Sequence, residues 1–211
     1  AFVTINADTM EAEQLIREGR DLGYNFDTAS LAGEDPETGR LFMPLRDTRG
    51  ALNLYSVDPE NGRRMSLVAR GDETTRGCIS SPDGRSFVRL SYNNSLNQYQ
   101  IAIEENDQWR ILYEARQNLI DMSVAGFTAD GQALLVRRYT DGPGRVSGLQ
   151  RLSLSDGAWG DIYYQNDRYD AGDVRIDPHR GYVAGVTITA ERTSTQWFDE
   201  ELAALQANLD Q

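Results

Sequence analysis

The chain has 211 residues, 39% of them hydrophobic, which is enough for a hydrophobic core of its own. Its formal net charge is −12, which argues against nucleic acid as a partner because a phosphate-binding surface needs a basic patch. The same acidic balance argues against binding to anionic membranes, so no membrane partner is expected.

Turn-forming sequences recur along the chain at an almost constant interval of about 22 to 26 residues. Each contains Gly, Asn or Asp, which tolerate the positive φ that a tight turn between two strands requires. These sequences lie at residues 35–39, 58–62, 82–84, 105–107, 129–131, 155–157 and 177–181. A fixed period of this kind is typical of a repeat architecture.

The segments between the turns have the two-residue alternation of β-strands. Residues 87–92 and 98–103 are examples. In the second segment Tyr99, Ile101 and Ile103 alternate with Gln98, Gln100 and Ala102. Two hairpins together make a four-stranded repeat of roughly 47 residues, which is close to the length of one β-propeller blade. The predicted fold is therefore all-β, a partial ring of about four blades with four antiparallel strands each.

In chain order, residues 1–18 predict half a blade, and residues 22–70, 71–116 and 117–165 predict three full blades. Residues 166–198 predict a partial blade. A closed ring normally needs four or more blades, so the unmatched pieces at both ends favour part of a larger ring.

The last predicted element is a helix over residues 199–210. Asp199 is a suitable N-cap, and Glu200 and Glu201 suit the positive end of the helix dipole. Leu202, Leu205 and Leu209 fall on one face. This apolar stripe predicts that the helix packs on the ring or leads into a following domain.

The sequence contains little that predicts chemistry. The only histidine, His179, lies in a predicted turn, the only cysteine, Cys78, has the setting of a buried structural thiol, and lysine is absent. No Gly-x-Ser-x-Gly motif occurs. The adjacent acids at 104–105 and 200–201 are expected to be solvated. We therefore predict no catalytic residue, no metal site and no cofactor within these residues.

The later part of the chain, from about residue 51 onward, nevertheless resembles a known family. Three motifs in order are the most specific: Tyr-Asp-x-Gly at 169–172, Asp-Pro-His-x-Gly at 177–181, and Phe-Asp-x-Glu-Leu at 198–202. The resemblance also uses residues 54–58, 61–63, 124–134 and 197–206. Together they resemble the N-terminal propeller of bacterial prolyl oligopeptidase family serine peptidases, most of all the dipeptidyl-peptidase and acylaminoacyl-peptidase-like members. Glu200 departs from the pattern, which often has Pro after the Asp.

The resemblance implies a function for the whole parent protein. In that family the catalytic Ser, Asp and His lie on an α/β-hydrolase domain that follows the propeller, and no residue of this chain matches them. The propeller caps the active site and limits access to short peptides, the substrates of the parent enzyme. The resemblance also favours a periplasmic or secreted parent. Exposed edge strands at both ends predict self-association of the excised blades.

If the chain contacts substrate, the loops that join the second and third strands of each blade are the candidates, because these loops lie on one side. Arg138 or Arg192 could hold a peptide carboxylate, since guanidinium groups read carboxylates bidentately. The full set of predicted substrate-binding residues is Tyr92, Asn93, Asn94, Arg138, Tyr139, Asp141, Glu191 and Arg192.

Three classes of function remain open at this point. The first is the non-catalytic propeller domain of a serine peptidase. The second is a stand-alone propeller that binds a protein or another ligand, although the Trp-Asp dipeptide of one adaptor class is absent. The third is an enzyme with a site on the propeller itself, which would need paired carboxylates at a defined separation.

Overall fold

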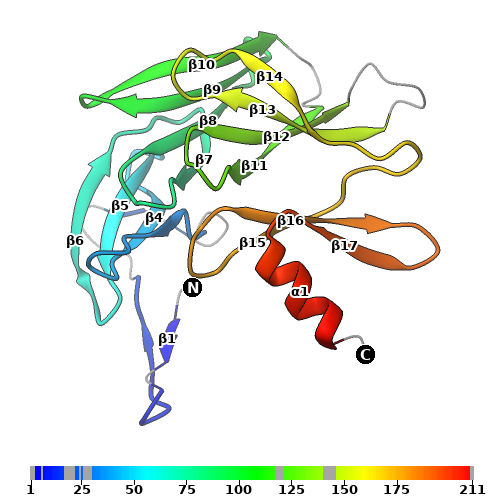
Figure 1. Cartoon of the computed structure of the whole chain (residues 1–211). Coiled ribbons are helices and arrows are strands. Elements are labelled where there is room, and N and C mark those ends of the chain that lie inside the picture. Colours follow the sequence, from blue (N-terminus) through cyan, green and yellow to red (C-terminus); the bar gives the residue numbers. More distant parts are fainter. Residues whose placement is uncertain are drawn as a thin grey trace. The chain divides into compact units, whose positions relative to one another are not determined.

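The structure is a computed structural model, and it describes residues 3–5, 7–16, 22, 23, 25, 30–116, 121–139 and 146–209. The chain divides into two compact units, Ala1–Asn118 and Leu119–Gln211. Apart from one helix, the regular elements are β-strands (Figure 1). No helix in the described part combines the length and the apolar character needed to cross a membrane.

The first unit contains three antiparallel sheets. A short hairpin pairs β1 (Val3–Ile5) with β2 (Ala12–Gln14). A four-stranded sheet follows, in the order β3 (Gly33–Glu34), β4 (Leu41–Arg46), β5 (Leu52–Asp58) and β6 (Asn61–Ala69). The next four-stranded sheet contains β7 (Thr75–Ser80), β8 (Phe87–Asn93), β9 (Gln98–Glu105) and β10 (Gln108–Arg116). In each sheet, strands that are consecutive in the chain are neighbours.

The second unit repeats this plan. Its four-stranded sheet contains β11 (Met122–Phe127), β12 (Ala133–Tyr139), β13 (Ser147–Ser153) and β14 (Trp159–Tyr164). A three-stranded sheet contains β15 (Val174–Ile176), β16 (Val183–Thr189) and β17 (Thr193–Trp197). The helix α1 (Glu200–Leu209) follows β17, at the position in the chain where a fourth strand stands in the other sheets.

The periodic turns have the backbone geometry that their sequences predict. The glycines that close five of them have φ between +65° and +71°: Gly39, Gly84, Gly131, Gly157 and Gly181. In each turn an Asp side chain accepts a hydrogen bond from a backbone N–H two residues further on, as from Glu37 to Asp35. These features confirm the five turn predictions. They could be predicted because both depend only on local residues.

Each unit buries an apolar layer between two of its sheets. In the first unit Phe42 of β4 and Phe87 of β8 meet edge to face, with ring centroids 4.9 Å apart, and Leu54 joins the same cluster. In the second unit Leu135 of β12 packs with Val186 of β16. Burying one such side chain stabilises the fold by roughly 1.5–3 kcal/mol. These layers make consecutive four-stranded meanders pack face to face, as propeller blades do, and the predicted fold class is confirmed.

The helix is confirmed, and of its apolar stripe Leu202 is half-buried whereas Leu205 and Leu209 are exposed. Asp199 caps the first turn by accepting hydrogen bonds from the backbone N–H groups of Glu201 and Leu202 at 2.9 and 3.0 Å. No residue of α1 is buried, and Leu205 and Leu209 are 54% and 74% exposed. The helix is therefore held at its first turn and leaves Leu205 and Leu209 uncovered.

Candidate functional site

His179 and Cys78, the most reactive side chains of the chain, both lie in structural positions. The backbone N–H of His179 donates to the Asp177 side chain at 2.8 Å, inside the β15–β16 turn, and His179 itself is exposed. Cys78 is buried on β7, and burial raises the pKa of its thiol to about 12. A thiol with so high a pKa is a poor nucleophile at neutral pH. Among the described residues, no group of His, Cys, Asp or Glu side chains could hold a metal ion.

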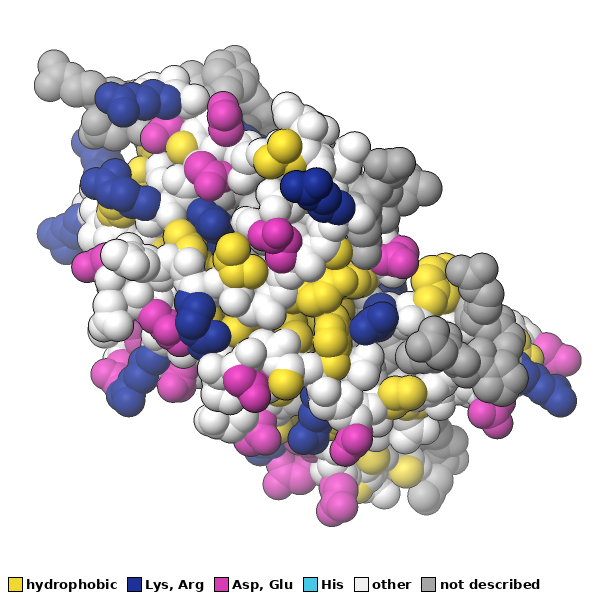
Figure 2. All heavy atoms as spheres, turned by 90° about the horizontal axis from the view of Figure 1, so that it is seen from above, with side chains coloured by type: hydrophobic (Ala, Val, Ile, Leu, Met, Phe, Trp, Pro, Cys, Tyr) yellow, Lys and Arg dark blue, Asp and Glu magenta, His cyan; other side chains and the backbone are white. Residues whose placement is uncertain are grey.

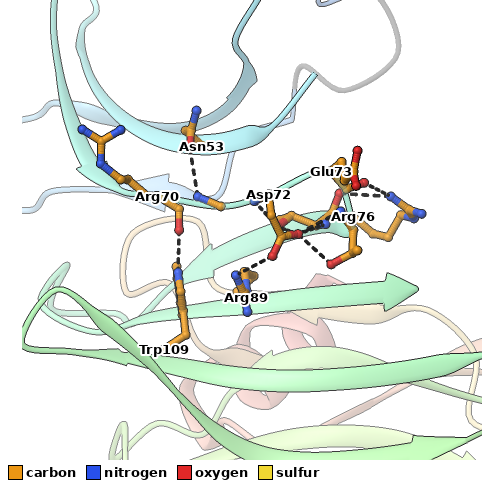
Figure 3. A network of polar contacts seen from close by, with 10 residues as sticks. Asn53, Arg70, Asp72, Glu73, Arg76, Arg89 and Trp109 are labelled. Carbon is orange, nitrogen blue, oxygen red and sulfur yellow. Dashed lines mark hydrogen bonds and ion pairs between the residues drawn. The ribbon is translucent and has the colours of Figure 1, made fainter. Parts of the chain in front are cut away.

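One polar network lies in the first unit, around the connection between β6 and β7 (Figure 3). Asp72 accepts hydrogen bonds from the backbone and hydroxyl groups of Thr74 and Thr75, at 2.6–3.2 Å. Its other carboxylate oxygen lies 3.3 Å from a guanidinium nitrogen of Arg89. Burial raises the pKa of Asp72, but the hydrogen bonds and the Arg89 charge outweigh it, so the pKa lies below its ordinary value.

Arg89 itself is enclosed by this network. Its guanidinium lies 4.9 Å from the ring centroid of Trp109, and its side chain is only 12% exposed. The indole N–H of Trp109 donates to the carbonyl of Arg70 at 2.6 Å, which ties β10 to the end of the β6 connection. Since Arg89 already has a carboxylate and an aromatic face, the network serves to join two sheets rather than to receive a ligand.

The second unit contains a cavity of about 380 Å³. It is lined by residues from the start of β11, the end of β12, the start of β13 and the β14–β15 connection. These residues are Asp121, Met122, Ser123, Arg137, Tyr139, Ser147, Asp170 and Ala171. The antiparallel meander brings the four segments together, because the first strand begins, the second ends and the third begins at the same edge of the sheet. Clefts of this size, with a few convergent polar groups, are typical of ligand sites.

The polar groups of the cavity differ in how firmly they are held. Asp170 accepts a hydrogen bond from the backbone N–H of Ser147 at 2.6 Å, and the backbone N–H of Ala171 donates to the carbonyl of Ser147 at 2.9 Å. Arg137 donates to the carbonyl of Gly172 at 3.2 Å. These contacts fix the connection between β14 and β15 against β12 and β13. They position one cation and one carboxylate at the cavity wall.

Strand alternation decides which side chains of β12 face the cavity. Arg137 and Tyr139 line it, and both lie two or four positions from Leu135, which packs toward the sheet β15–β17. Arg138 lies between them and points to the other face, where its guanidinium is 4.7 Å from the ring centroid of Trp159. Of the predicted substrate-binding residues that the structure describes, only Tyr139 therefore lines the cavity.

The structure places the other predicted residues in two turns. Asn93 ends β8, and its side-chain oxygen accepts hydrogen bonds from the backbone N–H groups of Ser95 and Leu96 at 3.0 and 3.2 Å. Tyr92 and Asn94 lie beside it at the β8–β9 turn. Glu191 and Arg192 are exposed at the β16–β17 turn. Asp141 lies outside the described residues.

The sequence interpretation did not find Arg137, Asp121 or Asp170. It considered only the loops between second and third strands, whereas Asp121 precedes a first strand and Asp170 lies between two sheets. A signal was present in the alternation of β12, because the buried Leu135 predicts that Arg137 and Tyr139 share its face.

On the face drawn in Figure 2, Arg side chains are interspersed with Asp and Glu rather than gathered into one basic patch.

No protein-family model and no curated protein matches the chain. Several solved structures do. TolB from Acinetobacter baumannii is 14% identical with a TM-score of 0.58, and the match covers 92% of this chain and 45% of TolB. A protein assigned as TolB in Agrobacterium tumefaciens is 14% identical with a TM-score of 0.52, covering 90% of this chain and 62% of its own.

A third match is the uncharacterized protein lmo1340 from Listeria monocytogenes, 7% identical, with a TM-score of 0.51 and coverage of 86% of this chain and 57% of that protein. At these identities the likeness is one of fold. The class that the sheets and these comparisons define is the β-propeller. The chain spans between 45% and 62% of the length of the three structures.

Proposed function

We propose that this chain is a non-catalytic β-propeller segment that caps the active site of a serine peptidase and limits access to short peptides. Its direct partner is an α/β-hydrolase domain of the same parent protein. The propeller fold supports the proposal, as does the setting of His179 and Cys78, neither of which lies in a catalytic arrangement among the described residues.

The observation that carries the proposal is a contact between two motifs of the family resemblance. Arg180, from the Asp-Pro-His-x-Gly turn, lies 3.2 Å from Asp199 and 2.8 Å from Glu201, at the start of the Phe-Asp-x-Glu-Leu helix. The hydroxyl of Tyr182 also donates to Asp199. The turn thus anchors the helix that follows the sheet, through Arg180 at the unspecified position of the first motif and through Tyr182 just after it.

The one departure from the family pattern fits this geometry. Glu200 is exposed and is the first residue of α1. Pro is also well tolerated at the first position of a helix, because the N–H that it lacks has no partner there. Glu and Pro are therefore interchangeable at this position without a change in the cap.

The experiment that tests the proposal is the intact mass of the native gene product before and after exposure to a fluorophosphonate, which labels activated serines. A product several times longer than 211 residues that takes up one label supports a peptidase cap. A product of about this length that takes up no label contradicts it. That result would favour the second candidate, a stand-alone binding propeller.

We also propose that the isolated chain self-associates through its edge strands. The hairpin β1–β2 presents Val3 and Ile5 at 51% and 62% exposure, and β17 is the last strand of a three-stranded sheet. Exposed strand edges pair readily with another chain. Sedimentation at increasing concentration is expected to show a rising mass, and a constant monomer mass would contradict this proposal.

A further inference from the structure

The cavity of the second unit presents a cation with unused hydrogen-bond donors. A guanidinium has five N–H donors, and among the described residues Arg137 donates one hydrogen bond, to the carbonyl of Gly172. Among the described residues, no carboxylate lies within ion-pair distance of Arg137. The side chain is half-buried and lines the cavity. This is the setting in which a guanidinium binds a carboxylate strongly.

The same cavity has two carboxylates that could bind a cationic group. Asp121 is exposed at the wall, just before β11. Asp170 uses one carboxylate oxygen for the backbone N–H of Ser147, which leaves the second oxygen for a ligand. With one Arg and two Asp side chains, the cavity wall repels a simple anion but suits a molecule that has both charges.

Hydroxyl groups complete the lining. Tyr139 is 47% exposed at the end of β12, and Ser123 and Ser147 stand at the starts of β11 and β13. Hydroxyls both donate and accept hydrogen bonds, so they suit the amide group of a peptide. The volume of about 380 Å³ is near the lower end of the range for ligand pockets, which limits the ligand to a small molecule.

From these groups we propose that the cavity binds short peptides in their zwitterionic form. The peptide carboxylate binds Arg137, and the terminal ammonium binds Asp121 and the second oxygen of Asp170. The choice of a peptide rests on the proposed function, whereas the pairing of charges rests on the cavity alone. A free amino acid shares this chemistry, so the test includes one.

The test is calorimetric titration of the full-length gene product after treatment with fluorophosphonate. The probes are Ala-Ala, N-acetyl-Ala-Ala, Ala-Ala amide and free alanine. We expect Ala-Ala to bind and either blocked peptide to bind about tenfold more weakly or worse, since each loses a charge-assisted contact. Tighter binding of alanine than of Ala-Ala would identify an amino-acid site and overturn the peptide assignment.

Two variants and one control locate the binding. Arg137→Met is expected to weaken Ala-Ala binding at least about tenfold. Asp121→Asn, at an exposed position, is expected to reduce the preference for Ala-Ala over its N-acetyl form, because only Asp170 then binds the ammonium. Arg138→Met is the matched control, because Arg138 is adjacent on β12 but stacks on Trp159, and it should bind Ala-Ala like the wild type. Circular dichroism verifies that each variant is folded.

The inference and the proposed function fail in different ways. Unchanged Ala-Ala affinity in folded Arg137→Met and Asp121→Asn proteins would overturn the peptide site, whether or not the product takes up the fluorophosphonate. A product that takes up no label but loses Ala-Ala binding on Arg137→Met would retain the site and remove the peptidase.

Discussion

The surroundings of Arg89 in the first unit and of Arg137 in the second differ, although both arginines stand on the second strand of a four-stranded sheet. Arg89 has a carboxylate at 3.3 Å and an indole at 4.9 Å. Arg137 has one backbone carbonyl and a cavity. A cation that is paired with a carboxylate and packed on an indole stabilises the fold, whereas one that lines a cavity and has no carboxylate beside it among the described residues is available to a ligand. The partners of an arginine, and not its strand position, therefore indicate its role.

The largest expected effect that tests this comparison is on stability. Arg89→Ala should lower the free energy of unfolding by about 2 kcal/mol, because it removes a packed stem, a cation–π contact and an ion pair. Arg137→Ala should lower it by about 0.5 kcal/mol or less, since it removes one hydrogen bond beside a cavity. Urea denaturation of both variants measures the difference, and equal losses would break the distinction.

The next largest expected effect is the loss of stability when a turn glycine is replaced in either unit. Gly84 and Gly131 close matching Asp-Gly turns, with φ of +70° and +65°. Replacement by Ala costs about 1 kcal/mol at such a φ. At Gly84 the added Cβ would also lie 3.2 Å from Pro36 and 3.3 Å from Phe42, whereas at Gly131 it meets nothing within 4 Å.

We therefore expect Gly84→Ala to cost about 2 kcal/mol and Gly131→Ala about 1 kcal/mol. Thermal unfolding of the two variants under identical conditions measures the costs. A larger loss for Gly131→Ala would show that the packing of the first unit around this turn does not resist the added methyl group.

A smaller effect concerns the pH dependence of the Arg89 network. The pKa of Asp72 is lowered in the folded state, so its carboxylate contributes stability that is fully present above the unfolded pKa of about 3.9 and is lost as the pH falls through the folded pKa. The stability difference between wild type and Asp72→Asn should be constant from about pH 5 to 8 and should shrink below about pH 4.

The control for this pH dependence is the same Asp72→Asn comparison made in the Arg89→Ala background. Removing the guanidinium removes one cause of the lowered pKa, so the loss should begin at a higher pH. An unchanged profile would show that the threonine hydrogen bonds alone set the pKa of Asp72.

The smallest expected effect concerns Cys78, which should not react while the chain is folded. Cys78 lies in the apolar cluster of the first unit, and burial raises its pKa to about 12. The folded chain should not react with Ellman's reagent at pH 8, whereas the chain unfolded in urea should release one equivalent of product. Rapid labelling of the folded chain would show that the first unit opens locally and exposes Cys78.

The sequence predicted the turns, the strands and the capped helix because each depends on neighbouring residues. Gly131 needs its positive φ whatever surrounds it, and Asp199 caps α1 through N–H groups two and three residues away. The candidate site was less accessible to prediction. Arg137 and Arg138 are adjacent and alike, and only packing against another sheet decides which one faces the cavity. The apolar stripe of α1 predicted a packed helix, but amphipathicity does not identify what covers it, and Leu205 and Leu209 are exposed.

The strand order has a consequence for how the chain is made. Every four-stranded sheet is a meander of consecutive strands, so its hydrogen-bond partners are all close in sequence. Domains with mostly local pairing fold fast, and a growing chain folds from its N-terminal end during synthesis. The sheet β3–β6 has all its strands once Ala69 has left the ribosome, and the sheet β7–β10 of the same unit then finds a finished surface on which to assemble. The ribosome thus delivers the sheets in the order in which they stack within each unit.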